Sequence, residues 1–447
     1  MPHTIKTAAR VSSRPSRLGE RVRQLRVAAG ITQTELAGDR FSKEYVSQIE
    51  RGKTRPTQET IEWIAARLGV DASFLASGVS ADERARVEAS LIRAEALSED
   101  HQYDDAVQHY VDIKDAVLAT GSPELRVRAL SGEGWGRMQR GEVRVALEHF
   151  DEARRLVEGD PFSDVDRADL MYRVGICRYK LSSISTAIGL FCEALTLAER
   201  SGMPCDLLRS NILSWRSRCY RRQRDWEGAR EDVERALELA EGLGDKRALG
   251  HVYFEASVVA ERNGHWVLAR TYAERAKLQY EEIADRANVG RLLGNLGGLN
   301  FLLGKPDEAK RYLKDAFAAS LEAGQERDAA QAVSSLAQVH LRTGEVETAE
   351  EQARHALSLL AGSEDEFMLE IGNAQLVLGR ALLEQDRLDE AEDVFKQAES
   401  TFDQAESASH RAAVWVAQGD LLQRRNDDRG AARQYRRAAE TLQDFRF

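Results

Sequence analysis

The chain has 447 residues, of which 43% are apolar and 31% charged, a balance typical of a protein with a buried core rather than of a disordered one. Its seven prolines are few beside the many Ala, Leu, Glu and Arg residues, so the composition favours helix and gives no sign of a sheet. The net charge is −11, yet residues 1–79 carry thirteen Lys/Arg against eight Asp/Glu, a balance of +5 that leaves −16 for the remainder. We therefore expect only the amino-terminal part to meet a polyanion, because the acidic remainder repels one.

Residues 1–17 are polar and basic and lack the apolar segment of a secretory signal. We predict a flexible basic arm here, with contact of Arg10, Arg14 and Arg17 to a minor groove or to phosphates as the alternative. No apolar run approaches the ~18 residues that a membrane helix needs. The sequence therefore predicts a cytoplasmic protein with no membrane contact.

The sequence between residues 18 and 76 predicts five short helices with clear boundaries. Apolar residues recur at helical spacing in this stretch, and glycines at positions 30 and 52 end the first and third helices. Each later helix is preceded by a residue whose side-chain oxygen can cap it. These caps are Thr32, Ser42, Thr57 and Asp71.

Two short helices joined by a tight turn, inside a small helical bundle, form the helix-turn-helix pattern. The order of Arg, Gly-Ile-Thr-Gln, Leu-Ala, Gln-Ile-Glu-Arg-Gly and Pro runs through two stretches, LGERVRQLRVAAGITQTELA and SKEYVSQIERGKTRPT. Over about sixty residues this order closely resembles the Xre and phage-repressor family of DNA-binding domains. The resemblance implies that residues 18–76 bind double-stranded DNA, with the third helix in the major groove.

The resemblance also implies which residues contact DNA. Four side chains of the third helix, Lys43, Glu44, Ser47 and Gln48, would face base edges, where such donors and acceptors can read sequence. The start of the second helix would contact a phosphate, aided by the helix dipole, and the residues after the third helix would hold the backbone. The full predicted set is Gln33, Ser42, Lys43, Glu44, Tyr45, Ser47, Gln48, Arg51, Lys53, Thr54 and Arg55.

Other positions of the family pattern are structural. The resemblance implies a buried ion pair between Arg26 and Glu50, and core positions at Val46 and Ile49. The turn before the third helix reads Gly-Asp-Arg-Phe-Ser, one residue shorter than the common turn of the family. We expect Phe41 to fill the core in place of the displaced glycine, which affects the tilt of the third helix.

After a polar linker, predicted at residues 77–86, the chain becomes repetitive over residues 87–447. A landmark alanine recurs every 40–42 residues, at Ala106, Ala146, Ala187, Ala229, Ala269, Ala309, Ala349, Ala391 and Ala431. Twelve residues before each stands a small residue, namely Ala94, Gly134, Gly175, Ser217, Ser257, Gly297, Ala337, Gly379 or Gly419. Four residues after it an aromatic residue often follows, at Tyr110, Phe150, Phe191, Phe395 and Tyr435.

Five residues before the landmark alanine the chain often has a residue that tolerates positive φ. These turn residues are Gly141, Gly264, Gly304, Gly344, Asp386 and Asn426. The pattern predicts a helix hairpin in which small residues let the two helices approach closely, with the aromatic residue filling the gap between hairpins. It resembles tetratricopeptide repeats, although the period exceeds their ~34 residues and would also suit HEAT-like repeats.

The tetratricopeptide resemblance implies an all-α fold, in which about nine hairpins stack into a right-handed superhelix whose groove is lined by the first helix of each. Arg, Asn and Gln abound at the positions that would face this groove, although the array is acidic. Asn and Gln can bond a peptide backbone, and Arg pairs with carboxylates; a solvated helix face is the alternative. The predicted ligand-binding residues are Tyr172, Tyr179, Asn211, Arg218, Arg221, Arg222, His251, Phe254, Arg291, Gln331 and Asn373.

A helix-turn-helix followed by many such repeats resembles the peptide-responsive quorum-sensing transcriptional regulators. The resemblance implies a homodimer whose array binds a short peptide and whose arrangement on two half-sites sets its DNA affinity. Two alternatives stay open: the array is a protein-interaction adaptor that the DNA-binding domain localises, or it serves dimerisation alone.

Catalysis is not expected from this sequence. The glycine-rich stretch of residues 132–136 follows no strand and lies in a repeat helix, so it is not a phosphate-binding loop. The nine histidines lack metal-ligand spacing, and the four cysteines lack CxxC spacing. We therefore predict neither an enzyme nor a metal or other cofactor.

Overall fold

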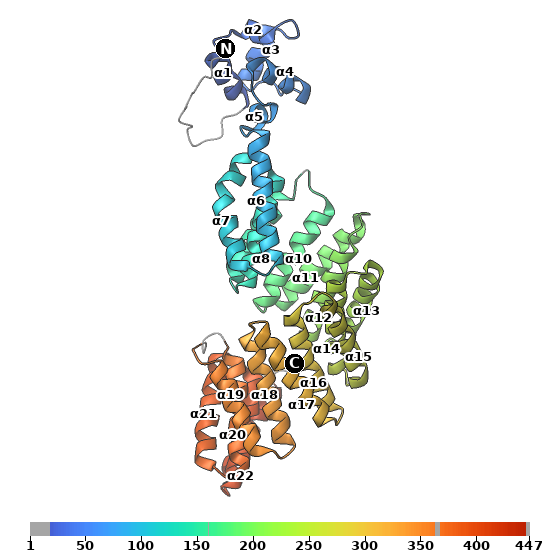
Figure 1. Cartoon of the computed structure of the whole chain (residues 1–447), viewed down its shortest axis with the longest axis vertical. Coiled ribbons are helices and arrows are strands. Elements are labelled where there is room, and N and C mark those ends of the chain that lie inside the picture. Colours follow the sequence, from blue (N-terminus) through green and yellow to red (C-terminus); the bar gives the residue numbers. More distant parts are fainter. Residues whose placement is uncertain (1–17, 160, 363–366, 444–447) are drawn as a thin grey trace. The chain divides into compact units, whose positions relative to one another are not determined.

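The computed structural model describes residues 18–159, 161–362 and 367–443, and all regular secondary structure in these ranges is α-helix (Figure 1). The chain divides into two compact units, with the boundary between Met203 and Pro204. The predicted basic arm, with Arg10, Arg14 and Arg17, lies outside the described residues. The prediction of an all-α fold is confirmed.

The first unit begins with five short helices, as predicted. Their bounds are α1 (Leu18–Ala28), α2 (Gln33–Ala37), α3 (Lys43–Glu50), α4 (Gln58–Leu68) and α5 (Ala72–Ser77). Each predicted cap accepts a hydrogen bond from a backbone N–H in the first turn of its helix, for example Asp71 from Phe74 at 2.9 Å. Gly30 and Gly52 follow α1 and α3 with φ of 70° and 68°, values that cost a residue without Cβ little.

The five helices enclose one apolar core, to which Val46 and Ile49 contribute side chains that are at most 1% exposed. Phe41 is half-buried and packs edge-on against Trp63, with ring centroids 5.0 Å apart, so its predicted core role is confirmed. At Gly19 of α1, a Cβ atom would lie 2.7 Å from the backbone oxygen of Glu50. This close approach of backbones positions α3 against α1.

The segment between the first five helices and the repeats is shorter than the predicted linker of residues 77–86. Helix α5 ends at Ser77, and only three residues separate it from the start of α6 (Ala81–Glu99). The reason is a capping box, in which Ser80 accepts from the backbone N–H of Glu83 while the Glu83 carboxylate accepts from that of Ser80. The polar residues that suggested a linker therefore form the first turn of a helix.

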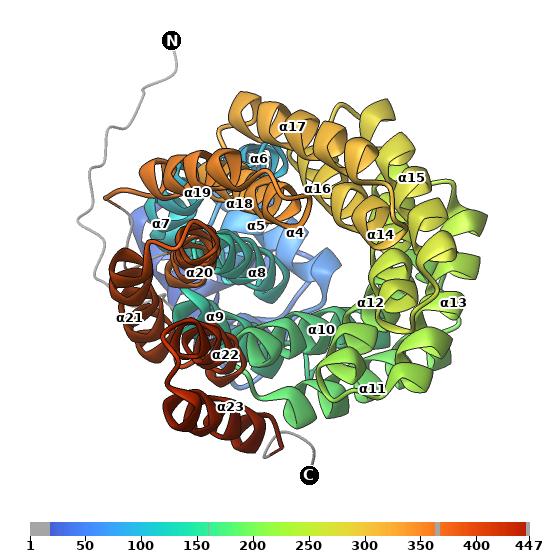
Figure 2. The ribbon, with the colours of Figure 1, turned by 90° about the horizontal axis from the view of Figure 1, so that it is seen from below.

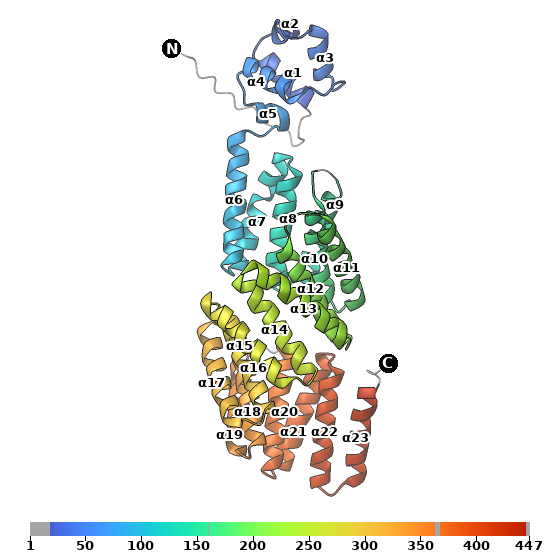
Figure 3. The same cartoon turned by 90° about the vertical axis from the view of Figure 1, so that its right-hand side faces the viewer.

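The remaining helices pair as antiparallel hairpins, three in the first unit and six in the second. The first unit contains α6 with α7 (Tyr103–Thr120), α8 (Pro123–Gln139) with α9 (Val143–Leu156), and α10 (Asp164–Lys180) with α11 (Ile184–Arg200). The second contains α12 (Asp206–Arg222) with α13 (Trp226–Leu243), α14 (Lys246–Arg262) with α15 (Trp266–Glu282), α16 (Arg286–Leu302) with α17 (Pro306–Glu322), α18 (Glu326–Arg342) with α19 (Val346–Leu359), α20 (Met368–Glu384) with α21 (Leu388–Gln404), and α22 (Ala408–Arg424) with α23 (Asp428–Gln443). Figure 3 shows α20 to α23 side by side. These are the predicted nine hairpins.

The landmark alanines all lie in the second helix of a hairpin and are at most 2% exposed. The small residue of the first helix faces the aromatic residue of the same hairpin: a Cβ at Gly134 would lie 2.9 Å from the Phe150 ring, and one at Gly175 would lie 2.6 Å from the Phe191 ring. The prediction that this ring fills the gap between hairpins was therefore wrong for Phe150 and Phe191, which fill the space that the glycine leaves within their own hairpin. It holds for Tyr110, whose ring lies against Gly132 of the next hairpin.

The turns inside the nine hairpins share one backbone conformation. All six predicted turn residues have positive φ, from 56° at Asp386 to 85° at Gly141. At the equivalent position of the other three hairpins the structure places His101, Ser182 and Arg224, with φ of 61° to 63°. The left-handed residue is thus a property of the hairpin rather than of glycine.

Two general properties of the described residues bear on function. Burial raises the pKa of the Cys177 and Cys219 thiols to about 12, so neither is poised to act as a thiolate. In the described ranges, no helix combines the length and the apolar character that crossing a bilayer requires.

Candidate nucleic-acid interface and ligand-binding face

Helix α3 turns one face to the core and the opposite face to solvent. Its core side holds Val46 and Ile49, whereas Lys43, Glu44 and Gln48 are exposed and Ser47 is half-buried. The side chains predicted to face base edges therefore share one outward face. This face combines a cation, a carboxylate, a hydroxyl and an amide, a set of donors and acceptors able to read base edges.

A network of three side chains holds the carboxyl end of α3. Arg26 donates to Glu50 through Nε at 2.6 Å and Nη2 at 3.2 Å, and Gln33 donates through Nε2 at 2.7 Å. Burial raises the pKa of Glu50, but the hydrogen bonds from Arg26 and Gln33 outweigh burial and leave it below its usual value. The ion pair between Arg26 and Glu50 is confirmed, and it fixes α3 relative to α1 and α2.

Three of the predicted DNA-binding side chains have structural contacts. The Gln33 amide, predicted to contact a phosphate, is bonded to Glu50. Ser42 caps α3 by accepting from the backbone N–H of Tyr45 at 3.2 Å, and Tyr45 is half-buried against Phe41, with centroids 5.2 Å apart. These three residues shape the interface as well as bordering it.

The basic segment after α3 is exposed and anchored to the helix. Arg51, Lys53 and Arg55 are exposed, and Thr54 is half-buried. The backbone N–H of Lys53 donates to the carbonyl of Gln48 at 2.9 Å, which folds the segment back against the end of α3. Three cations thus lie beside the outward face of α3, where a phosphate backbone would pass.

The second unit contains most of the predicted ligand-binding residues. Figure 2 shows that α12, α14, α16 and α18 form its inner row, with α13, α15 and α17 outside them. The Glu255 carboxylate of α14 pairs with two arginines of α12, at 2.8 Å from Arg218 Nε and 3.4 Å from Arg221 Nη2. The Arg218 guanidinium lies over the Trp215 ring, 4.5 Å from its centroid. Glu255 was not among the predicted residues, although it is the shared partner of two of them.

His251 lies near this cluster. Its Nδ1 is 2.7 Å from the Tyr280 hydroxyl, and burial, assisted by Arg218 and Arg291, lowers the pKa of His251 to about 4. The ring is therefore neutral at pH 7. Burial also raises the pKa of Tyr280, so its hydroxyl stays protonated while it shares a hydrogen bond with Nδ1. Arg291 pairs with Asp328 at 3.0 Å.

The other predicted ligand-binding residues lie in both units. In the first unit, Tyr172 is 9% exposed and lies beside Phe191, with centroids 6.2 Å apart, so it is largely a core residue; Tyr179 is half-buried. In the second unit, Arg222 and Gln331 are exposed, and Asn211, Phe254 and Asn373 are half-buried. Their roles as ligand contacts stay predictions.

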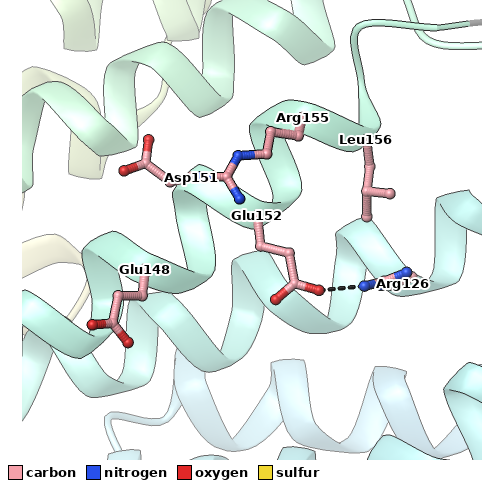
Figure 4. A pocket seen from close by; sticks show the side chains of 6 residues that line it. All are labelled: Arg126, Glu148, Asp151, Glu152, Arg155 and Leu156. Atoms are coloured by element: carbon pink, nitrogen blue, oxygen red, sulfur yellow. Dashed lines mark hydrogen bonds and ion pairs between the residues drawn. The ribbon is translucent and has the colours of Figure 1, made fainter.

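A shallow depression also lies on the first unit, between α8 and α9 (Figure 4). An ion pair between Arg126 and Glu152 crosses it, and its remaining lining residues are Glu148, Asp151, Arg155 and Leu156. None of the predicted ligand-binding residues lines it. Because the depression is shallow and Glu152 already neutralises Arg126, we assign it no function.

Comparison with protein families agrees with this geometry. Residues 17–78 match the model of a helix-turn-helix domain. Tetratricopeptide-repeat models match residues 256–322 and 288–362, and another such model matches residues 351–409. The chain therefore carries a helix-turn-helix domain followed by a tetratricopeptide-repeat array.

Individual relatives refine this result. The chain is 38% identical over 64 residues to the HTH-type transcriptional regulator DdrOP3 of Deinococcus deserti, which covers 14% of this chain and 50% of the relative. The chain thus matches about half the length of this curated relative. Among solved structures, the apo quorum sensor NprR from B. thuringiensis aligns with 86% of this chain and 97% of its own, with a TM-score of 0.56 and 13% identity. A Rap protein complexed with competence and sporulation factor aligns with 78% and 99%, with a TM-score of 0.52 and 18% identity. At such identities these two structures show the shared fold.

Proposed function

We propose that the protein is a sequence-specific, DNA-binding transcriptional regulator. The observation that carries this proposal is the outward face of α3, which presents Lys43, Glu44 and Gln48 while Glu50 at its end is held by Arg26 and Gln33. A reading helix must be rigid to distinguish bases, because a contact that shifts by an ångström no longer discriminates. The helix-turn-helix family match and the regulator relative support the same conclusion.

The two functions that we propose belong to the two parts of the chain, the helix-turn-helix domain and the repeat array. Residues 18–76 bind DNA, and residues 87–447 form a sensing and dimerisation array for a small ligand, for which a short peptide is our proposal. A quorum sensor and a Rap protein complexed with a signalling factor share the array's fold, which supports a ligand-binding role. Ligand binding would change DNA affinity only if it favours one arrangement of a homodimer over another.

The DNA-binding claim is tested by offering the full-length protein a library of genomic fragments and sequencing those retained. A regulator enriches a small set of fragments with a common sequence, and its affinity falls steeply with added salt, since phosphate contacts release counterions. Uniform recovery of all fragments, with and without cell extract, would overturn the proposal.

The ligand claim has a separate test. The purified protein is denatured, and the low-molecular-weight material that it releases is identified by mass spectrometry. Recovery of a peptide that changes DNA affinity when added back supports the sensing role. A stoichiometric folded partner without any peptide would instead favour the adaptor function, and unaltered DNA affinity with every released compound would contradict ligand sensing.

A further inference from the structure

The arginine pair of α12 shares a single carboxylate of the next hairpin. The Glu255 side chain is only 4% exposed, whereas those of Arg218 and Arg221 are 23% and 24% exposed. Two guanidinium groups and one carboxylate leave one surplus positive charge. The carboxylate of the cluster is thus buried, whereas its two guanidinium groups are partly exposed to solvent.

The two guanidinium groups also have unused donors. Within the described part of the chain, the Nε–H groups of Arg218 and Arg221 are shielded from solvent and find no acceptor at a hydrogen-bonding angle, although Arg218 Nε is close to Glu255. Each guanidinium carries five N–H donors in a planar fork, of which one carboxylate satisfies a minority. Trp215 stacks on Arg218 and limits its rotation. The pair is therefore an oriented set of donors that is only partly filled.

We propose that Arg218 and Arg221 form a half-filled carboxylate clamp, in which Glu255 orients the two guanidinium groups and a carboxylate of the array's ligand accepts from the donors on their exposed side. This inference rests on the proposed ligand-sensing function. A carboxylate fits better than a neutral group because it removes the surplus charge and can accept two parallel N–H bonds. Glu255 demonstrates the match, since its two oxygens are already divided between the two arginines.

By binding to the clamp, a ligand can affect how successive hairpins of the array pack together. The Glu255 pair joins α12 to α14, which belong to successive hairpins. A second carboxylate bound by the same two arginines would alter their ion pairs with Glu255 and so change how α12 packs against α14. Glu255 is therefore a positioning residue, and Arg218 and Arg221 are the groups that touch the ligand.

The first experiment asks whether the clamp accepts a carboxylate from solution. The Glu255→Ala variant of the full chain is heated in acetate and in chloride at equal ionic strength. We expect acetate to raise the midpoint of unfolding of Glu255→Ala above its value in chloride, because a guanidinium fork pairs with a carboxylate. The matched control carries Arg218→Gln and Arg221→Gln in addition to Glu255→Ala, so that it lacks the same carboxylate and also the two guanidinium groups. Equal midpoints of Glu255→Ala in acetate and chloride, or equal effects of acetate on both variants, would overturn the clamp.

The second experiment uses a pool of random seven-residue peptides, made both as free acids and as carboxamides. Peptides that stay with the full-length protein through gel filtration are identified by mass spectrometry. We expect retention of the free acids to exceed that of the carboxamides, and Arg218→Gln to lower free-acid retention about tenfold, the usual effect of losing one charge-assisted bond. Arg262→Gln makes the same charge change at an exposed position of α14 and should retain the preference. Equal retention of both forms would overturn the clamp. Retention of neither form would contradict the proposed peptide ligand instead, and the acetate experiment then decides on the clamp.

Discussion

The Glu50 carboxylate holds the Arg26 guanidinium through both of its oxygens, and Arg26 at the same time donates from Nη1 to the backbone carbonyl of Ile31 at 2.9 Å. One arginine thus joins α1, the turn before α2 and the end of α3. The Glu50 side chain is 4% exposed and that of Arg26 is 13% exposed, so water screens the pair weakly. The orientation of the reading helix depends on this contact.

Replacing Glu50 by Ala should lower the free energy of unfolding of the helix-turn-helix domain by about 3 kcal/mol, because Arg26 keeps its charge in a buried place without its partner. The effect is measured by hydrogen exchange of the α1 and α3 amides in the full chain. Glu59→Ala is the control, since its pair with Arg40 is exposed and contributes less than about 1 kcal/mol. Equal effects of the two substitutions would contradict the structural role of Glu50.

The same contact gives a pH dependence with a definite sign. The pKa of Glu50 is lower in the folded protein than in the unfolded chain, where a Glu titrates near about 4.3. Its stabilising contribution is therefore complete above that unfolded value and is lost as the pH falls through the folded pKa. Unfolding of the domain measured at successive pH values should show a weaker acid destabilisation in Glu50→Gln than in the wild type. An unchanged acid limb in the variant would show that other groups dominate it.

A binding selection with random DNA sequences should distinguish side chains that contact bases from side chains that contact phosphates. Lys43→Ala and Gln48→Ala should relax the preferred sequence, at a cost of about 1–3 kcal/mol for the preferred base pair. Lys53→Ala should weaken all sequences alike and reduce the salt slope by about 1, because we expect Lys53 to contact phosphate alone. Lys396→Ala makes the same charge change at an exposed place in α21 and should leave DNA binding unaltered. Loss of sequence preference in Lys53→Ala would contradict this assignment.

At the turns of the repeats, where φ is positive, we expect a substitution to glycine to stabilise the protein and a substitution to alanine to destabilise it. Arg224 is exposed and has φ of 63°, a conformation that costs a residue with a Cβ about 1 kcal/mol, so Arg224→Gly should stabilise the second unit by roughly that amount. Gly264→Ala, at the equivalent position with φ of 77°, should destabilise it by a similar amount. Thermal unfolding of both variants beside the wild type tests the pair. A loss of stability in Arg224→Gly would mean that its side chain contributes more than the strain costs.

The pair of His149 with Glu133 joins α9 to α8 and has the opposite pH dependence. Both ring nitrogens have an acceptor, Glu133 at 3.2 Å from Nε2 and the Val145 carbonyl at 2.8 Å from Nδ1, so the doubly protonated ring fits best. The hydrogen bond to Glu133 raises the pKa of His149, against burial, which lowers it. Its contribution is therefore complete below the unfolded pKa, near about 6.5, and is lost as the pH rises through the folded value.

Replacing His149 by Asn should remove this contribution, which is about 1 kcal/mol at neutral pH. Above neutral pH, the free energy of unfolding of the variant should fall less steeply with rising pH than that of the wild type. Thermal unfolding between pH 6 and 9 checks the variant against the wild type, and a titration of the His149 ring by NMR gives the direction of the shift directly. A ring that titrates below the value of a free histidine would contradict the assigned pair.

The sequence predicted what local chemistry determines. Caps such as Thr32 and Asp71 are recognisable because the residue that accepts the bond stands three positions from the donor. The hairpin period was likewise visible, since small residues recur wherever two helices touch. His101, Ser182 and Arg224 stand where the period of the repeats predicts a turn, but nothing in their side chains indicates a positive φ.

The candidate site was predictable in part for the same reason. The exposed residues of α3 follow from helical periodicity once Val46 and Ile49 are placed in the core. Gln33 was assigned to a phosphate, but its amide bonds Glu50, a contact between two helices that no local pattern specifies. Glu255 escaped notice because its partners lie in the preceding hairpin, and only the stacking of the two hairpins brings them together.

The shared backbone conformation of the nine turns has an evolutionary consequence. A segment that runs from one of these turns to the next starts and ends with a positive φ, even where a histidine, serine or arginine replaces glycine. A gene encoding such an array can duplicate or delete one such segment in frame. The segments on either side of the new junction then still meet in the same backbone conformation. Recombination can therefore change the number of hairpins in the array while the helix-turn-helix domain stays unaltered.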